Sequence, residues 1–286
     1  MDENLTIKKT ISYIKTELKE LYPLNEINSF INLIFERFLN YSSTKLHISQ
    51  EEKISEELFK DIIAVTEDLK QQKPIQYILE EAHFYDLKFK VEAGVLIPRQ
   101  ETEELVDWII KENSNRKIKI LDIGTGSGCI AITLAKNLPR ATVFASDVSS
   151  KALEIAKFNR KSNSIDLHFL QFDILNLSLW PDETFDIIVS NPPYVTVKEK
   201  KLMQKNVLDF EPELALFVPD NSPLKFYDKI IDFGKKHLNP NGKIYFEINE
   251  AFGKETALLF NKNIFTDISL RKDLNGKDRM LRGVLK

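Results

Sequence analysis

The sequence has very few residues that could form a disulfide or hold a metal. It contains one cysteine, Cys129, and four scattered histidines among 286 residues. A single cysteine excludes an intramolecular disulfide, and no cysteine or histidine spacing matches a zinc site. We therefore expect a protein without a disulfide framework and without a bound metal.

Long apolar runs and a leader-like N-terminus are also missing. No run approaches the roughly 20 apolar residues that a membrane-spanning helix needs. The first four residues, Met1 to Asn4, do not resemble the start of a secretory signal peptide. These features predict a soluble protein of the cytoplasm that does not act at a membrane.

Charge of one sign is not in excess. The 40 basic and 43 acidic residues leave a net charge of −3, whereas proteins that grip nucleic acid usually present a strongly basic surface. This balance argues against DNA or RNA as the main partner, although it leaves room for a local basic patch. With 43% hydrophobic and 10% aromatic residues, the bulk of the chain can bury a core rather than remain disordered.

The first 73 residues show the apolar spacing of helices. One helix is expected to end before Pro23, a second covers about 27–38, and a third runs from about Ser49 to Lys70 because Ser49 to Glu52 fits a capping box. Residues 1–73 are therefore predicted to form a small helical bundle. The apolar positions of the first helix are Ile7, Ile11, Ile14, Leu18 and Leu21.

Residues 74–99 have a different period. Apolar and polar residues nearly alternate from Phe84 to Ile97, as in two short antiparallel strands, and Gly94 is a candidate for the turn between them. This segment is predicted to be a β-hairpin connector between two domains.

Residues 100–286 alternate between strands and helices, which predicts an α/β domain whose parallel sheet is covered by helices on both faces. One of these helices is expected to open at Ser222 and Pro223. Asn275-Gly276 is a hairpin signal and predicts an antiparallel last strand, as in the Rossmann-like sheet of SAM-dependent methyltransferases. The five other strands are expected at 118–123, 142–146, 167–172, 185–190 and 243–248.

A glycine loop follows the first of these strands. Gly124, Gly126 and Gly128 precede a helix, and Asp147 ends the next strand about 20 residues later, where a carboxylate can hold ribose hydroxyls. The spacing GxGxG weakens a pyrophosphate interpretation. S-adenosylmethionine (SAM), which has a ribose and a cationic sulfonium but no phosphate, fits better.

Two further aspartates occupy similar positions. Asp122 precedes the glycines and Asp173 ends the third strand, so either could contact the methionine or adenine part of this cofactor. A helix N-cap is an equally common role for an aspartate after a strand. The sequence leaves both interpretations open.

The tetrapeptide Asn191-Pro192-Pro193-Tyr194 follows the fourth strand and is the most informative in the chain. The Asn191 side-chain oxygen and the Pro192 carbonyl can together accept both hydrogens of one planar NH2 group, while Tyr194 covers its face. Such a grip helps a poorly nucleophilic nitrogen attack a methyl group. The motif alone leaves open adenine N6, guanine N2 and a side-chain amide as acceptors.

Other segments resemble the HemK/PrmC family, whose members are protein-(glutamine-N5) methyltransferases that modify peptide-chain release factors. The matching segments are Pro74 to Leu79, Phe84-Tyr85, Val95 to Arg99 with Glu101 to Glu103, Leu121 to Gly128, Ser190 to Tyr194, and Glu211-Pro212 with Ala215-Leu216. The chain departs from the family at Gln100, where proline is usual, and at Glu80 and Asp86, where glycine is frequent.

The resemblance implies a SAM-dependent enzyme that methylates the glutamine of a Gly-Gly-Gln motif, with the helical domain recognising the release factor. It favours a protein substrate and, as we expect, a monomer; a nucleic-acid amino-methyltransferase is the alternative. It places Asn191, Pro192 and Tyr194 in catalysis and Asn191, Pro192, Pro193 and Tyr194 at the substrate. The residues it places at the cofactor are Gly124, Thr125, Gly126, Ser127, Gly128, Asp147, Asp173, Ile174 and Asn191.

Overall fold

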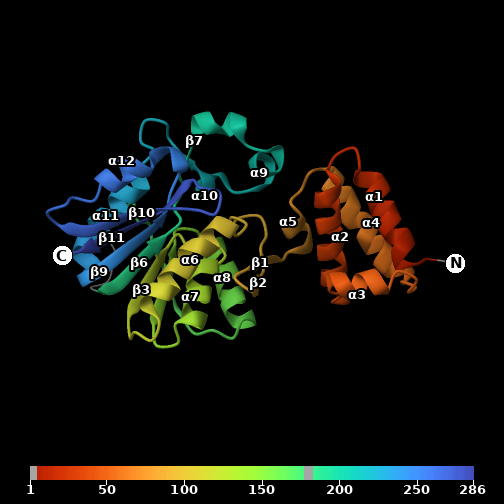
Figure 1. Cartoon of the computed structure of the whole chain (residues 1–286), viewed down its shortest axis with the longest axis horizontal. Coiled ribbons are helices and arrows are strands. Elements are labelled where there is room, and N and C mark those ends of the chain that lie inside the picture. The colour runs from red at the N-terminus through yellow and green to blue at the C-terminus, as the bar shows by residue number, and fades with distance from the viewer. Residues whose placement is uncertain (1–4, 177–182) are drawn as a thin grey trace. The chain divides into compact units, whose positions relative to one another are not determined.

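The computed structural model describes residues 5–176 and 183–286. The chain divides into two compact units (Figure 1). One contains Met1–Glu81 with Lys205–Phe210, and the other contains Ala82–Gln204 with Glu211–Lys286. We call them the helical unit and the sheet unit.

Within residues 5–81, the helical unit is built from helices whose apolar residues meet in one core. Thr6 caps α1, since its side chain accepts a hydrogen bond from the Lys9 amide, and Pro23 precedes α2. The predicted helical character of this region is therefore confirmed. The helices are α1 (Ile7–Leu18), α2 (Leu24–Leu39), α3 (Ser43–Ile48), α4 (Glu56–Lys70), α5 (Ile75–Leu79) and α9 (Lys205–Phe210).

The predicted start of the third long helix at Ser49 is wrong. Ser49 ends the short helix α3, and the true N-cap of α4 is Ser55, whose hydroxyl accepts a hydrogen bond from the Leu58 amide at 3.1 Å. Both Ser49 and Ser55 are residues that can cap a helix, and α4 begins after Ser55 because a continuous helical stretch follows it directly. Helix α3 was not predicted, because six residues are too few to show an apolar period.

The β-hairpin consists of β1 (Ala82–Phe84) and β2 (Leu87–Phe89). Its turn is Tyr85-Asp86, with φ of 48° and 60°, and not Gly94 as predicted. Two positive φ values are typical of the tight turn that matches strand twist in a two-residue hairpin. Gly94 has φ of 117° in a later turn, so the expected second strand up to Ile97 is shorter than the alternation suggested.

The sheet unit contains a seven-stranded sheet in the order β10-β11-β9-β6-β3-β4-β5. Pairing is parallel from β5 to β9, and β11 is antiparallel to both of its neighbours. The predicted mostly parallel sheet with an antiparallel last strand is confirmed. The strands are β3 (Lys119–Ile123), β4 (Thr142–Asp147), β5 (His168–Gln171), β6 (Phe185–Ser190), β9 (Leu238–Glu247), β10 (Phe265–Lys272) and β11 (Asp278–Leu285).

Helices cover both faces of this sheet. Helices α6 and α7 pack with Ile120 and Val189 on one face, and α11 packs with Leu121 and Ile188 on the other. The predicted opening of α11 at Ser222 and Pro223 is wrong by two residues: its N-cap is Leu224, and Ser222-Pro223 form a preceding turn in which the Ser222 carbonyl accepts from the Lys225 amide. The helices are α6 (Gln100–Asn113), α7 (Cys129–Asn137), α8 (Ser150–Ser162), α10 (Glu213–Leu216), α11 (Lys225–His237) and α12 (Gly253–Leu258).

The remaining short elements of the sheet unit are the paired strands β7 (Val195–Thr196) and β8 (Phe217–Val218) and the 3-10 helices η2 (Val197–Leu202) and η3 (Glu250–Phe252). Among residues 5–176 and 183–286, no helix combines the length and the apolar character needed to cross a membrane.

The hairpin turn gives a stability prediction. Asp86 is exposed and has φ of 60°, a conformation that glycine adopts without steric cost and a β-branched residue resists. We expect Asp86→Gly to raise the free energy of unfolding of the sheet unit by up to about 1 kcal/mol, and Asp86→Val to lower it by about 1–2 kcal/mol. Urea unfolding followed by tryptophan fluorescence measures both; a destabilised Asp86→Gly variant would contradict the prediction.

Candidate active site

The glycine loop joins β3 to α7 with a backbone that only glycine adopts easily. Gly124, Gly126 and Gly128 have φ of 75°, 55° and 84°. A Cβ atom added at Gly128 would lie 3.0 Å from Ile132 Cδ1 and 3.1 Å from Ala156 Cβ, so a side chain there would separate α7 from α8. At Gly124 and Gly126 the same atom would meet nothing within 4 Å. The outer side of the loop is therefore open to a ligand.

Asp147 lies beside this loop at the end of β4. Its two carboxylate oxygens accept hydrogen bonds from the Gly126 amide and the Ser149 amide, both at 2.9 Å. Burial raises the pKa of Asp147, and these amide donors oppose that rise. The arrangement fixes the carboxylate at the edge of the loop, while each oxygen keeps capacity for a further donor.

Asp122, in β3, forms a hydrogen bond with the glycine loop from inside the protein. It is fully buried, and its Oδ2 accepts a hydrogen bond from Thr125 Oγ1 at 2.6 Å. Burial raises the pKa of Asp122 to about 7, against the opposing effect of the Thr125 hydroxyl. The side chain therefore orients the loop rather than presenting itself to a ligand.

Asp173 and Ile174 follow β5 at the same sheet edge. The backbone hydrogen bond from the Phe172 amide to the Asp147 carbonyl, at 3.0 Å, aligns this segment with the end of β4. Asp173 is exposed and accepts a hydrogen bond from the Leu175 amide, whereas Ile174 is buried. The structure brings both residues to the edge that carries Asp147.

Strand β6, which pairs with β3, is followed directly by Asn191 and the two prolines. The Asn191 Nδ2 atom donates to Thr102 Oγ1 at 3.2 Å. Within the part of the chain that the structure describes, neither Asn191 Oδ1 nor the Pro192 carbonyl oxygen accepts a hydrogen bond. Two adjacent acceptors are thus available at the strand end.

A buried glutamate links this tetrapeptide to the rest of the sheet unit. Glu247, the last residue of β9, accepts from Thr102 Oγ1 at 2.5 Å through Oε2 and from Tyr194 Oη at 2.9 Å through Oε1. Burial raises the pKa of Glu247, which the two hydroxyl donors and the charge of Arg279 oppose. Burial, followed by the nearby charge of Glu247, raises the pKa of Tyr194 well above its usual value.

Known proteins resemble this chain over almost its full length. A release factor glutamine methyltransferase of Flavobacterium psychrophilum is 49% identical over 282 residues, which cover 97% of this chain and 99% of the relative. The chain belongs to the release factor glutamine methyltransferase family. The family protein of Bacteroides thetaiotaomicron is 43% identical, over 96% of this chain and 99% of its own length.

Two other comparisons agree with the fold. Residues 100–210 match the family model described as "Methyltransferase small domain". The crystal structure of a methyltransferase from Pyrococcus furiosus superposes with a TM-score of 0.52 at 19% identity, covering 71% of this chain and 90% of the other. The likeness confirms the predicted methyltransferase architecture.

The departures from the family pattern have a structural explanation. Glu80 and Asp86, which stand where the family often has glycine, both have positive φ, 52° and 60°. Gln100 is the first residue of α6, and Arg99 is its N-cap. Proline is favoured at that helical position because its fixed φ suits the first turn. Glutamine is accommodated there because the first turn of a helix imposes no special backbone.

Two family segments far apart in the chain are joined by an ion pair between the buried Glu211 and the half-buried Arg99. Glu211 accepts from the Arg99 guanidinium at 2.5 Å and from the Ile97 amide at 3.3 Å. The Glu211-Pro212 segment therefore anchors the strand-like segment that precedes α6.

Asn159 of α8 is a further supporting residue that the sequence did not reveal. It is fully buried, donates to the Ser127 carbonyl and to the Lys90 carbonyl at 2.9 Å each, and accepts from the Lys90 amide at 2.6 Å. One side chain thus ties the glycine loop to the segment after the hairpin. An asparagine inside a helix gives no local signal for such a role.

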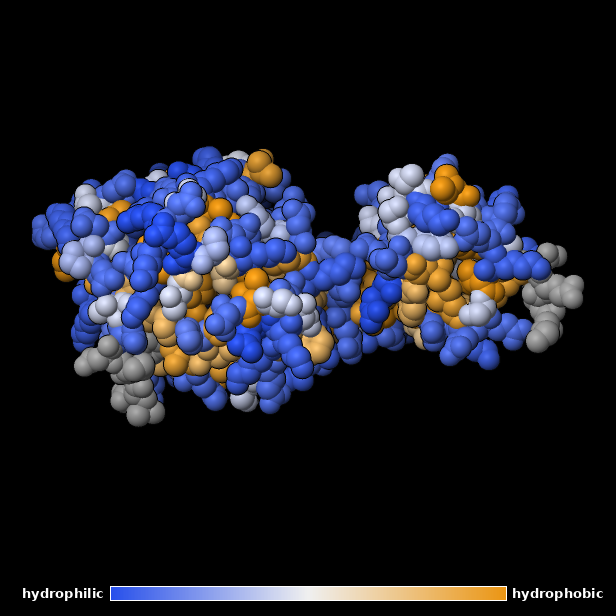
Figure 2. All heavy atoms as spheres, turned by 90° about the horizontal axis from the view of Figure 1, so that it is seen from below, coloured by the Kyte–Doolittle hydropathy of each residue, from blue (hydrophilic) through white to orange (hydrophobic). Residues whose placement is uncertain are grey.

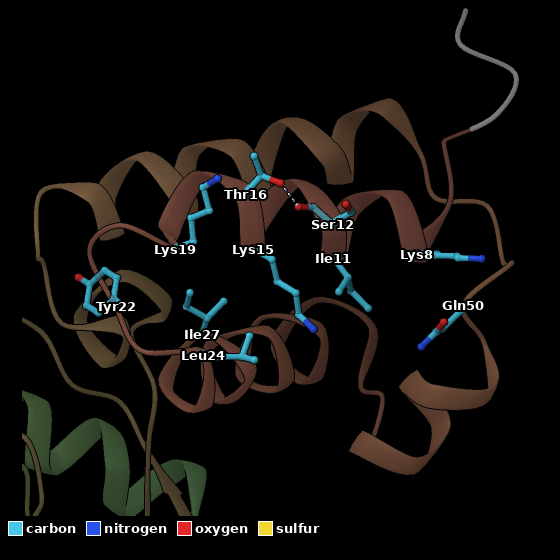
Figure 3. A pocket seen from close by; sticks show the side chains of 10 residues that line it. All are labelled: Lys8, Ile11, Ser12, Lys15, Thr16, Lys19, Tyr22, Leu24, Ile27 and Gln50. Atoms are coloured by element: carbon cyan, nitrogen blue, oxygen red, sulfur yellow. Dashed lines mark hydrogen bonds between the residues drawn. The ribbon is translucent and has the colours of Figure 1, made fainter.

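The helical unit carries a separate groove of about 520 Å³ between α1 and α2. Figure 3 shows Ile11 and Lys15 extending from α1 toward Leu24 and Ile27 of α2. Hydrophobic residues reach the surface of this unit among hydrophilic ones (Figure 2), and Leu24 is 62% exposed. Lys8, Lys15 and Lys19 add positive charge to the lining. The groove lacks the residues for catalysis but suits contact with a protein.

Proposed function

We propose that this protein transfers the methyl group of SAM to the side-chain amide nitrogen, N5, of the glutamine in the Gly-Gly-Gln motif of a peptide-chain release factor. The observation that carries the proposal is a pair of adjacent acceptors at the end of β6, Asn191 Oδ1 and the Pro192 carbonyl, which accept no hydrogen bond from any described residue. A carboxamide NH2 presents two hydrogens in one plane, and two adjacent acceptors can bind both of them.

The cofactor fits the residues around the glycine loop. The outer side of the loop at Gly124 and Gly126 is open, and Asp147 holds a carboxylate beside it for the ribose hydroxyls. Asp173 and Ile174 lie at the same edge for the adenine. When bound, SAM supplies an electrophilic methyl group. Thr125, Ser127 and Gly128 complete the loop on which it would rest.

Asn191, Pro192, Pro193 and Tyr194 act on the glutamine. Asn191 Oδ1 and the Pro192 carbonyl would accept its two amide hydrogens and so stabilise the positive charge that develops on nitrogen while the nitrogen–carbon bond forms and the sulfonium–methyl bond breaks; S-adenosylhomocysteine would leave, and the nitrogen would lose one proton. Pro193 keeps the backbone rigid, and Tyr194 shields the planar group from water. Fixing the nitrogen on the line of attack supplies the proximity contribution to the rate.

A labelling experiment tests this function. The protein is incubated with methyl-labelled SAM and either purified release factor or duplex DNA. We expect label on the Gly-Gly-Gln glutamine, located by mass spectrometry, and none on DNA. Label on adenine, or a release factor whose Gly-Gly-Gln glutamine is replaced and is still labelled, would overturn the proposal.

The helical unit is proposed to recognise the release factor through its groove. The apolar floor around Ile27 and the lysines of α1 suit an acidic surface with exposed apolar side chains. Lys15 and Lys19 form no ion pair with any described residue, so their charges are available to a partner. Acting on a translation factor, the protein is expected to work in the cytoplasm, and as a monomer.

Charge reversal tests this recognition surface. We expect the double variant Lys15→Glu/Lys19→Glu to raise the KM for intact release factor about tenfold through lost attraction at the rim, while kcat and the Kd for SAM change less than about twofold. The matched control is Lys53→Glu/Lys60→Glu, which makes the same charge change at exposed positions of the same unit that do not line the groove. Equal KM values for the two variants would count against the groove.

A further inference from the structure

We propose that Glu247 is a positioning residue that sets the direction of the Asn191 side-chain amide through the Thr102 hydroxyl. The inference rests on the proposed function, because the amide direction matters only if Asn191 Oδ1 receives a substrate hydrogen. Glu247 itself contacts neither substrate nor cofactor in this scheme.

The first step is the polarity of the Thr102 hydroxyl. A hydroxyl has one hydrogen to donate, and that of Thr102 goes to Glu247 Oε2 at 2.5 Å. Toward Asn191 the Thr102 oxygen can then only accept, and it does so from Asn191 Nδ2 at 3.2 Å. The amide oxygen of Asn191 must therefore point away from Thr102.

The second step is the hydrogen bond that Tyr194 donates to the same carboxylate. Tyr194 Oη donates to Glu247 Oε1 at 2.9 Å, so the two oxygens of one side chain accept two hydroxyls. A glutamine of the same size has only one oxygen. Its NH2 would face either Thr102 or Tyr194, and one of the two hydroxyls would have to reverse its direction.

The third step is the burial of the group. Glu247 is only 1% exposed, and a carboxylate in such a place destabilises the fold unless it is fully hydrogen-bonded. An apolar residue would fill the end of β9 at lower cost. The position instead holds a carboxylate, which accepts from both the Thr102 and the Tyr194 hydroxyl.

Three conservative variants test the proposal. If the NH2 group of the new glutamine faces Thr102, the Thr102 hydroxyl donates to Asn191 instead of accepting from it. The Asn191 amide then turns its NH2 group toward the substrate NH2, so we expect Glu247→Gln to lower kcat about tenfold to thirtyfold. Thr102→Val, which can neither donate nor accept, should lower kcat to a similar extent. Thr102→Ser restores the hydroxyl and should remain within about twofold of wild type. The KM for release factor and the Kd for SAM should change less than about twofold throughout, because binding surfaces are retained.

A second readout does not depend on turnover. In 15N-edited NMR spectra, the Asn191 side-chain NH2 resonances should be close in wild type and Thr102→Ser and clearly shifted in Thr102→Val, with folding checked by thermal unfolding. Wild-type kcat in well-folded Glu247→Gln and Thr102→Val, or unchanged Asn191 resonances in Thr102→Val, would overturn the inference. Failure of the wild-type protein to label glutamine would instead overturn the proposed function, and the NMR result would still decide the orientation of Asn191.

Discussion

Replacing Asn191 by alanine is expected to lower kcat for glutamine methylation about a hundredfold or more. The substitution removes one of the two acceptors that bind the substrate NH2, and it removes the one whose position is fixed by Thr102. Loss of a single preorganised group of this kind typically costs a factor of about 10²–10³ in kcat. The acceptor acts on charge that develops only as the methyl bond forms, so the rate constant suffers more than binding.

Single-turnover methylation of release factor measures this effect, and calorimetric titration shows whether SAM still binds. The matched control is Asn137→Ala, an exposed asparagine whose side chain donates to the Thr133 carbonyl on α7; it should remain within about twofold of wild type. Near wild-type turnover in Asn191→Ala would refute the proposal that Asn191 Oδ1 binds a hydrogen of the substrate NH2. Loss of turnover accompanied by an equal loss of SAM affinity would assign Asn191 to the cofactor instead.

The strands and the site loops could be predicted because their signals are local. The strand expected at 185–190 has these same bounds in the structure, since an apolar run meets the Asn-Pro break directly. Asp147 and the glycines lie together as expected, because parallel strands end at one edge of the sheet. The helix starts at Ser49 and Ser222 were wrong because a capping residue is common in turns as well as at helices.

The supporting residues could not be predicted, because their partners are distant in the chain. Thr102 meets Glu247 across 145 residues, and Asn159 meets Lys90 across 69. A threonine in the first turn of a helix and a glutamate at a strand end carry no pattern that links them. For Asp122 the sequence left a ligand contact and a capping role equally open, and the structure adds that its side chain is fully buried and accepts from Thr125.

Replacing Asp147 by alanine is expected to weaken SAM binding about tenfold to a hundredfold. The carboxylate is proposed to accept from the ribose hydroxyls, and hydrogen bonds to a charged group contribute about 1.5–3 kcal/mol. The same oxygens accept from the amides of Gly126 and Ser149, so the variant also releases the loop on which the cofactor would rest. Both effects reduce affinity, and neither acts on the acceptors at Asn191.

Calorimetric titration with SAM measures the change, and the substitutions Asp147→Asn and Asp166→Ala separate its causes. Asp147→Asn keeps one acceptor oxygen and the side-chain volume, so its affinity should lie between those of wild type and Asp147→Ala. Asp166 is 96% exposed and pairs only loosely with Arg160 at 3.5 Å, so its removal should leave binding unchanged. Because saturating SAM compensates for weak binding, Asp147→Ala should regain much of its turnover at high cofactor concentration, whereas Asn191→Ala should not. Unchanged affinity in Asp147→Ala would place the ribose elsewhere along the sheet edge.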